Sequence, residues 1–378
     1  MKLYKQYLRI FLFKGKVRIF CIIMKDLKNL IDALYNGQPL TENEFRNLIE
    51  NPSLAPYAAE KAVEVRHKHY GNSVYIRGLI EISNYCKNDC LYCGIRKSNR
   101  SCERYRLSKE EILSCCDEGY PLGFRTFVMQ GGEDMYYTDD ALCDIIRSIK
   151  EKYPDCAVTL SLGERSYDSY KRLKDAGADR YLLRHETADK AHYEKLHPQS
   201  LSFDNRMECL KNLRTLGYQV GCGFMVGSPH QTSAELAKDL VFLQEFRPEM
   251  CGIGPFIPHK DTPFKEYAAG SLELTCYLLS LVRLILPTVL LPSTTALGSI
   301  HPKGREMGIL AGANVVMPNL SPFDNREKYM LYNNKLSSGS ESAQNLIELK
   351  EKMSSIGYEI VISRGDWDTT RFKTINFA

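Results

Sequence analysis

The chain has 378 residues, 44% of them hydrophobic, so it can bury one large core or two ordinary ones. Its net charge is +4 with acidic and basic residues interspersed, which argues against a nucleic-acid-binding or membrane-binding surface. Thirteen cysteines, an odd number at scattered positions, argue against a disulfide framework and favour a reducing cytoplasm.

The N-terminal residues 1–23 mix basic and aromatic side chains, and Lys14, Lys16 and Arg18 interrupt the apolar run. This segment is a poor signal peptide and is too short and too charged to span a bilayer. We interpret it as a non-native or disordered extension, with a genuine amphipathic anchor as the alternative. Met24 then opens an amphipathic helix, and we predict a helical N-terminal cap over residues 24–72.

Residues 73–318 alternate short β-branched or aromatic runs with helical periods, which indicates parallel βα units. An α/β fold of the (βα)8 TIM-barrel type fits this series, because eight such units close into a barrel. An open, doubly wound sheet is the alternative, but no G-x-G-x-x-G turn follows the first strand. The predicted strands are 74–83, 125–130, 156–162, 179–185, 218–227, 249–256, 289–295 and 312–318.

Residues 319–378 are predicted to form a short C-terminal extension packed on the barrel, with one helix from about Ser340 to Gly357. The unusual polar residues follow the carboxyl ends of the strands. In a barrel this is the face on which active sites are built.

A cysteine-rich loop, "SNYCKNDCLYCGIRKSN" at 83–99, follows the first predicted strand and spaces Cys86, Cys90 and Cys93 as C-x3-C-x2-C. A structural zinc site needs four protein ligands, and no second cysteine pair lies at a suitable spacing. Three thiolates instead suit a 4Fe–4S cluster that keeps one iron open for another ligand. A zinc-stabilised binding protein without catalytic activity remains the alternative.

The cysteine motif directly after a first barrel strand, with Tyr92 before its last cysteine, resembles the radical S-adenosylmethionine (SAM) superfamily. The resemblance implies that the three cysteines bind the catalytic cluster and that SAM chelates the open iron. Reductive cleavage of SAM then yields a 5′-deoxyadenosyl radical. The stretch "QGGED" after the second strand resembles the segment that binds the SAM amino group, which involves Gly131, Gly132 and Glu133.

Five longer stretches narrow the resemblance to the HydE family, the radical SAM maturases of FeFe-hydrogenase. It extends over roughly residues 24–335, and the tail "SRGDW" is similar as well. Biotin synthase and methylornithine synthase share the cysteine loop and the barrel, so a sulfur-inserting enzyme or a mutase remains an alternative. The five stretches are "TLSLGE" (159–164), "AGADRYLLRHETA" (176–188), "GIGPFIPHKDTP" (252–263), "GANVVMPN" (312–319) and "SRGDW" (363–367).

The HydE resemblance also implies roles for single residues. Arg184 and Glu186 are expected in the SAM pocket, with Glu186 on the ribose hydroxyls, and Arg206 is expected on the SAM carboxylate. Residues expected to line the SAM and substrate cavity are Met225, Met317 and Tyr329. Residues expected in an inner pocket for a small anionic ligand are Thr159, Thr294, Thr295 and Ala296.

The same resemblance implies a substrate and partners. The substrate would be a small organometallic species, an iron bearing carbon monoxide, cyanide and cysteine, made by HydG, with the product passed toward HydF. Contacts with both maturases would be transient, and an electron donor is required. Some HydE proteins bind an accessory cluster through further cysteines, but residues 333–345 contain none here. We therefore predict one 4Fe–4S cluster, with no nucleic-acid or membrane partner.

Overall fold

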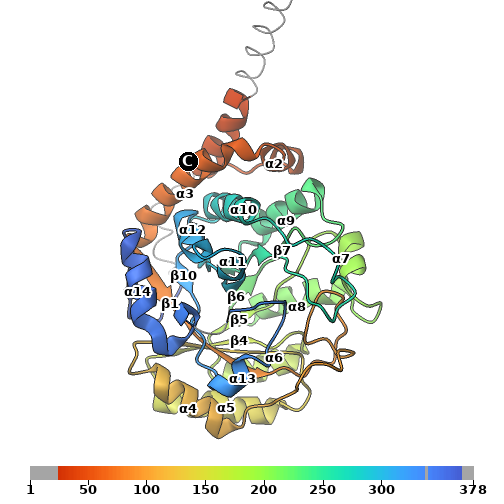
Figure 1. Cartoon of the computed structure of the whole chain (residues 1–378), viewed down its shortest axis with the longest axis vertical. Helices are drawn as coiled ribbons and strands as arrows, with labels where there is room; N and C mark the ends of the chain where they lie inside the picture. Colours follow the sequence, from red (N-terminus) through yellow and green to blue (C-terminus); the bar gives the residue numbers. More distant parts are fainter. Residues whose placement is uncertain (1–23, 337–338, 368–378) are drawn as a thin grey trace, which may run out of the picture.

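The computed structural model describes residues 24–336 and 339–367. The interpretation of residues 1–23 as an extension lies outside the described residues, as do positions 337–338 and 368–378 of the predicted C-terminal extension. Figure 1 shows a ring of helices around a central set of strands, with the N-terminal helices on one outer side.

A closed circle of parallel strands forms the centre of the molecule. Six of them form one sheet in the order β2-β3-β4-β5-β6-β8, and β1 pairs with β10. Parallel bridges Met250–Leu290 and Pro292–Val315 complete the circle, which confirms the predicted barrel. The strands are β1 (Ser73–Ile76), β2 (Gly78–Ser83), β3 (Thr126–Gly131), β4 (Ala157–Ser161), β5 (Arg180–Leu182), β6 (Gln219–Cys222), β8 (Met250–Cys251) and β10 (Val315–Val316).

Several predicted strands are interrupted or reduced, beginning with 74–83, which divides into β1 and β2. The run at 218–227 divides into β6 and β7 (Met225–Val226), and the run at 249–256 divides into β8 and β9 (Gly254–Pro255). The seventh strand, predicted at 289–295, makes only the two bridges, because Pro292 has no N–H to donate to a ladder.

The helices form the outer layer because each buries one apolar face. Helix α4 begins with a capping box formed by Ser108 and Glu111, and both of its hydrogen bonds are present. Helix α5 buries Leu142, Ile146 and Ile149 on one side. The ring consists of α4 (Lys109–Gly119), α5 (Asp139–Lys152), α6 (Tyr167–Asp175), α7 (Lys190–Leu196), α8 (Phe203–Thr215), α9 (Ser233–Phe246), α10 (Leu272–Ile285), α11 (Thr295–Ile300) and α12 (Gly304–Leu310).

The N-terminal cap consists of helices that pack outside this ring. Residues 24–35 are helical, and α2 (Glu42–Ile49), η1 (Pro52–Leu54) and α3 (Ala55–Tyr70) follow. Helix α3 packs against α10 and α2 packs against α9. None of the helices within the described ranges is long and apolar enough to cross a membrane.

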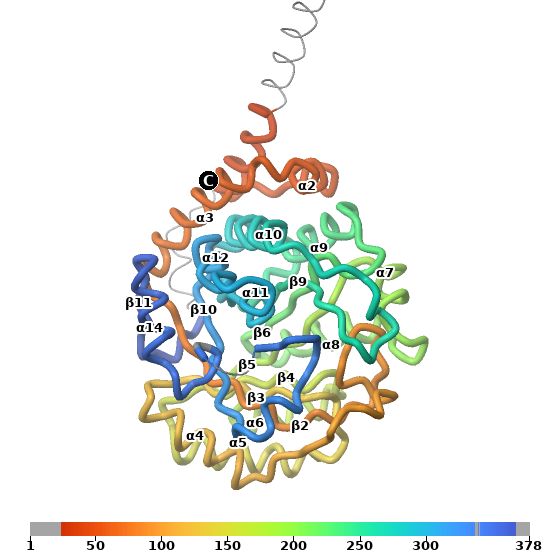
Figure 2. The backbone as a smooth tube through the Cα atoms, viewed as in Figure 1, coloured from red at the N-terminus to blue at the C-terminus, as the bar shows by residue number. Residues whose placement is uncertain are grey.

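The C-terminal extension crosses the barrel mouth before it returns to the outside. Gly94 of the cysteine loop donates to Leu331 O, and Asn333 donates to Pro258 O, so this segment joins two loops of the mouth. It is blue in Figure 2 and runs in front of the strands. The elements of the extension are α13 (Phe323–Arg326), η2 (Gly339–Glu341), η3 (Ala343–Asn345), α14 (Leu346–Ser355) and β11 (Glu359–Val361).

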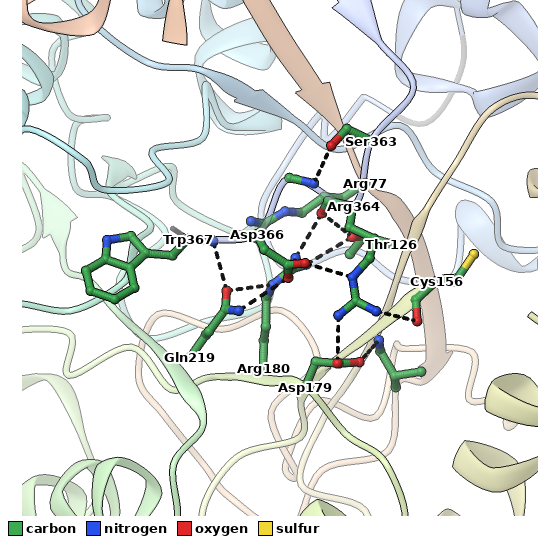
Figure 3. A network of polar contacts seen from close by, with 12 residues as sticks. Arg77, Thr126, Cys156, Asp179, Arg180, Gln219, Ser363, Arg364, Asp366 and Trp367 are labelled. Atoms are coloured by element: carbon green, nitrogen blue, oxygen red, sulfur yellow. Dashed lines mark hydrogen bonds and ion pairs between the residues drawn. The ribbon is translucent and has the colours of Figure 1, made fainter. Parts of the chain in front are cut away.

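The last described residues close the opposite, amino-terminal end of the barrel. Strand β11 pairs in parallel with β1, a pairing that the sequence did not predict. The chain then places Arg364 and Asp366 beneath the strands (Figure 3), where Arg180 Nη2 donates to Arg364 O at 2.8 Å and to Asp366 at 2.5 Å. Thr126 also donates to Arg364 O. The predicted helix near 340–357 begins only at Leu346, after two 3-10 turns.

Candidate active site at the barrel mouth

The cysteine loop leaves the carboxyl end of β2 and lies against the loop that follows β3. Gly132 N donates to Ser83 O at 3.1 Å, and Lys87 N donates to Glu133 O at 2.9 Å. A side chain at Gly132 would not fit, because a Cβ there would lie 2.1 Å from Tyr85 O and 2.8 Å from Cys86 Cβ. The two predicted motifs therefore form one surface.

The three thiols of this loop are free and half-buried. Burial raises the pKa of all three, that of Cys93 to about 12, and the nearby thiolates of the same loop raise the pKa of Cys90 and Cys93 further. Metal binding must therefore displace protons from these thiols. Soft thiolate ligands in this number and order fit an iron–sulfur cluster. Within the described ranges, no group of three His, Cys, Asp or Glu side chains is arranged to hold a single metal ion.

Arg104 fixes the backbone of the cysteine loop, a role that its sequence position did not suggest. Its guanidinium donates to Ile95 O at 2.8 Å and to Arg96 O at 2.6 Å. Its positive charge offsets part of the rise that burial causes in the pKa of the Cys86 and Cys93 thiols. Buried carbonyl groups are thereby satisfied without regular secondary structure.

A chain of charged side chains lies across the mouth from the loop. Arg206 of α8 donates to Glu164 Oε1 at 2.5 Å and to Arg184 O at 2.8 Å, and its Nη2 lies 4.0 Å from Glu133 Oε1. Burial alone would lower the pKa of Arg206, but Tyr193 and the two carboxylates raise it, so this cation is permanent. The structure thus brings Arg206 and Glu133 together, and it adds Glu164, which no predicted role covered.

Glu186 occupies an unusual backbone position in this group. Its φ is +65°, in the left-handed region that non-glycine residues rarely adopt. Its carboxylate is buried, with Oε2 3.6 Å from Arg184 Nη2 and without a hydrogen-bond partner among the described residues. Such strain at a buried polar group is typical of functional sites.

The predicted cavity residues separate into different parts of the barrel. Tyr92 and Met225 belong to one apolar cluster with Leu196, Phe256 and Phe264, and Tyr92 OH lies 3.2 Å from His197 Nε2. Met317 instead packs in a second hydrophobic cluster with Met250 and Val315.

Tyr329 is buried close to the cysteine loop. Gln130 donates to its hydroxyl at 3.4 Å. Burial raises the pKa of Tyr329, and the charges of Glu81 and, to a smaller extent, of Cys93 and Cys86 raise it further. This residue and Tyr92 therefore lie near the cluster site.

The predicted inner pocket contains two hydroxyls without partners. Thr159 and Thr294 each have a buried Oγ1 that makes no hydrogen bond to any described residue. Thr294 and Ala296 face Gly254 of β9, whose added Cβ would lie 2.8 Å from Thr294 Oγ1 and 3.7 Å from Ala296 Cβ. The Thr295 hydroxyl already has a partner, because it donates to Glu341 Oε2 at 2.8 Å.

Two buried ion pairs near the predicted inner-pocket residues were not predicted from the sequence. Lys335 of the C-terminal extension lies 2.7 Å from Glu81 of β2, and Arg305 of α12 pairs with Glu341. A signal existed for Glu81, since it is the one charged residue in the apolar strand "GLIEIS". Lys335 and Glu341 sit in a polar stretch where nothing marks them as buried.

Comparisons with known proteins agree with this architecture. Residues 80–243 match the model of the radical SAM superfamily. The chain is 48% identical over 275 residues to the [FeFe] hydrogenase maturase subunit HydE of Thermotoga maritima, which covers 73% of this chain and 78% of that protein. It is 27% identical over 336 residues to 3-methylornithine synthase of Methanosarcina acetivorans, covering 87% and 93% of the two chains.

Two solved structures share the fold. Methylornithine synthase (PylB) superposes with a TM-score of 0.77 at 26% identity, covering 88% of this chain and 97% of that one. The hydrogenase maturase HydG superposes with a TM-score of 0.73 at 22% identity, covering 89% and 76%, which shows the fold alone.

The barrel, the three-cysteine loop and the superfamily match define a radical SAM enzyme, a class whose members use a 4Fe–4S cluster and SAM. Within that class the sequence identity places the chain more narrowly. It belongs to the HydE family of [FeFe] hydrogenase maturases, as the resemblance of its strand-end motifs predicted.

Proposed function

We propose that this chain acts in assembly of the FeFe-hydrogenase H-cluster, on a small iron complex bearing carbon monoxide, cyanide and cysteine ligands. HydG would supply this substrate and HydF would receive the product, both through transient contacts. The proposal is supported by membership of the HydE family and by the buried hydroxyls of Thr159 and Thr294, which have no hydrogen-bond partner among the described residues.

Cys86, Cys90 and Cys93 would hold one 4Fe–4S cluster. When bound, the cluster and SAM together supply a 5′-deoxyadenosyl radical, given an electron from a donor protein. A single cluster is proposed because residues 333–345 contain no cysteine. A cytoplasmic location, inferred from cysteine usage, is part of the same proposal.

The convergence of Arg206, Glu133 and Glu186 beside the cysteine loop is the observation that carries the proposal. The permanently charged Arg206 would bind the SAM carboxylate, for which a guanidinium has matching geometry. The buried Glu186 Oε2 would accept hydrogen bonds from the ribose hydroxyls. Backbone oxygens of Gly131, Gly132 and Glu133 would receive the SAM amino group, while Tyr92, Met225, Met317 and Tyr329 would exclude water.

A mutase acting on an amino acid is the second candidate, because buried charged side chains lie near Thr295. An amino-acid substrate calls for charged groups in the pocket. Here Glu81 is neutralised by Lys335, and Arg305 by Glu341. Each of these charges has an oppositely charged buried partner, whereas the uncharged hydroxyls of Thr159 and Thr294 have no hydrogen-bond partner among the described residues. This arrangement favours the small iron complex.

The proposal is tested by anaerobic reconstitution with iron and sulfide, followed by electron paramagnetic resonance (EPR) of the reduced protein with and without SAM. A 4Fe–4S signal that changes on SAM addition is expected. The substrate is tested separately by asking whether the protein restores hydrogenase activity in an extract lacking its maturase. A protein that binds zinc without iron or labile sulfide would overturn the cluster assignment. Turnover of an amino acid in place of maturation would favour the mutase.

A further inference from the structure

A buried pair of side chains, His185 and Asp239, lies next to Glu186. The function proposed so far gives this pair no role. His185 follows β5 and Asp239 belongs to α9, and the side chains of both are fully buried. His185 Nε2 lies 3.2 Å from Asp239 Oδ1. Asp239 Oδ1 also accepts from Ala188 N at 2.6 Å. One carboxylate oxygen therefore anchors both ends of the turn that contains Glu186.

The hydrogen bonds determine the tautomer of His185. Gly223 N donates to His185 Nδ1 at 3.2 Å, so Nδ1 carries no proton and the proton is on Nε2, facing Asp239. Burial lowers the pKa of His185 to about 3, so the ring is neutral at physiological pH. The ring packs against Phe242 with centroids 4.7 Å apart, which prevents it from rotating. His185 is thus a rigid, neutral link between α9 and the end of β6.

The backbone of Glu186 depends on this link. Glu186 N donates to Gly223 O at 3.0 Å, and Gly223 is the residue that His185 holds from the other side. Gly223 is itself confined, since an added Cβ would lie 2.0 Å from Gly252 O. A left-handed φ of +65° at Glu186 persists only where surrounding contacts enforce it. Asp239, His185 and Gly223 supply those contacts.

We propose that Asp239, acting through His185 and Ala188, is a positioning residue that holds Glu186 in its strained conformation and so presents the carboxylate to the bound nucleoside. The inference rests on the role proposed above for Glu186 toward the SAM ribose. Asp239 does not touch the ligand. Its contribution is to keep the Glu186 carboxylate in place before SAM arrives, which reduces the ordering cost of binding.

Asp239→Leu in the reconstituted holoenzyme removes both acceptor contacts while it keeps the branching and the number of heavy atoms of the side chain. We expect SAM affinity, followed by the EPR change on titration, to fall by about tenfold, within the range seen when supporting hydrogen-bond partners are removed. Iron content and the EPR signal without SAM are expected to stay unchanged. Asp239→Asn keeps the Oδ1 acceptor for Ala188 and His185, so its affinity is expected within about threefold of wild type. Unchanged affinity in Asp239→Leu would overturn the inference.

A double-mutant cycle with Glu186→Gln separates this inference from the function on which it rests. If Asp239 acts through Glu186, then Asp239→Leu adds little to the loss already caused by Glu186→Gln. If Glu186→Gln leaves the SAM affinity unchanged, the proposed role of Glu186 toward the SAM ribose is wrong. If Glu186→Gln lowers the SAM affinity and the effect of Asp239→Leu adds to it in full, only the positioning role of Asp239 is wrong.

General destabilisation is controlled by Ser280→Ala. Ser280 is a buried polar residue of the outer helix α10, and it donates to Ala311 O at 3.0 Å, away from the mouth. Its SAM affinity is expected to equal that of wild type. Should Asp239→Leu fail to take up iron, His185→Leu replaces it, because the Ala188–Asp239 contact then remains. The same loss of SAM affinity is expected, and its absence would overturn the inference.

Discussion

Arg206 of helix α8 lies with its Nη2 4.0 Å from Glu133 Oε1, although the two residues come from different βα units. Both side chains are about nine-tenths buried, and Glu133 shares its loop with the glycines that touch the cysteine loop. The same guanidinium is held by Glu164 at 2.5 Å. Arg206 thus links helix α8 to the loops around the three cysteines. We therefore expect that mutation can affect SAM binding and cluster binding separately.

Arg206→Ala is expected to weaken SAM binding by about tenfold or more while leaving cluster loading unchanged. The physical reason is loss of a charge-assisted bidentate partner for a carboxylate, whereas the thiols belong to a separate loop. SAM titration by EPR and iron analysis measure the two effects. Arg206→Lys is the matched control and should recover only part of the affinity, because it lacks the planar fork. Equal loss of iron and of SAM affinity would indicate a structural role.

Cys90→Ala is expected to abolish SAM cleavage while the fold is retained, because the loop lies at the rim and no spare cysteine lies within the motif. Formation of 5′-deoxyadenosine measures the activity, and thermal unfolding measures the fold. Cys102→Ala is the control, since Cys102 is half-buried nearby and lies outside the motif. Cleavage by Cys90→Ala at the level of Cys102→Ala would refute the ligand assignment.

Lys335→Met is expected to lower the free energy of unfolding by about 3–5 kcal/mol, because it leaves the fully buried Glu81 carboxylate without its cation. The double variant Glu81→Gln/Lys335→Met should recover much of that loss, since no buried charge remains unpaired. Denaturant unfolding of the cofactor-free protein measures both. A double variant that is less stable than Lys335→Met would contradict this account of the pair.

Asp366→Asn tests the closure at the amino-terminal end of the barrel. Burial would raise the pKa of Asp366, but Arg180 and Arg364 lower it below the usual value. A carboxyl with a lowered pKa stabilises the fold above its unfolded pKa of about 3.9, and the stabilisation is lost as the pH falls through the folded value. Because Asp366 is 35% exposed, solvent screens part of the effect, and we expect a loss of about 1–2 kcal/mol at pH 7.

The difference between Asp366→Asn and wild type should shrink as the pH falls below about 4, since wild type then loses the same charge. Glu351→Gln, an exposed position on α14, is the control and should change stability little at any pH. A constant difference from pH 7 to pH 3 would show that Asp366 contributes through packing or hydrogen bonding rather than through charge.

Sequence reasoning identified the barrel and the cysteine loop, because both depend on patterns that are local in the chain. It was less reliable where pairing depends on distant segments. The strand at 289–295 is reduced to bridges, and β11 beside β1 was not predicted. Met225 and Met317, both predicted to line the SAM and substrate cavity, pack in different hydrophobic clusters, and their shared role stays a prediction.

The sequence by itself determined the βα alternation and the spacing of Cys86, Cys90 and Cys93, because these follow from periodicity and from short-range chemistry. Only the tertiary structure decided which charges meet. Lys335 reaches Glu81, and Asp239 reaches His185, across large distances in sequence. Burial makes such pairs obligatory, since an unpaired buried charge is costly, but nothing in the local sequence states which partner a residue will find.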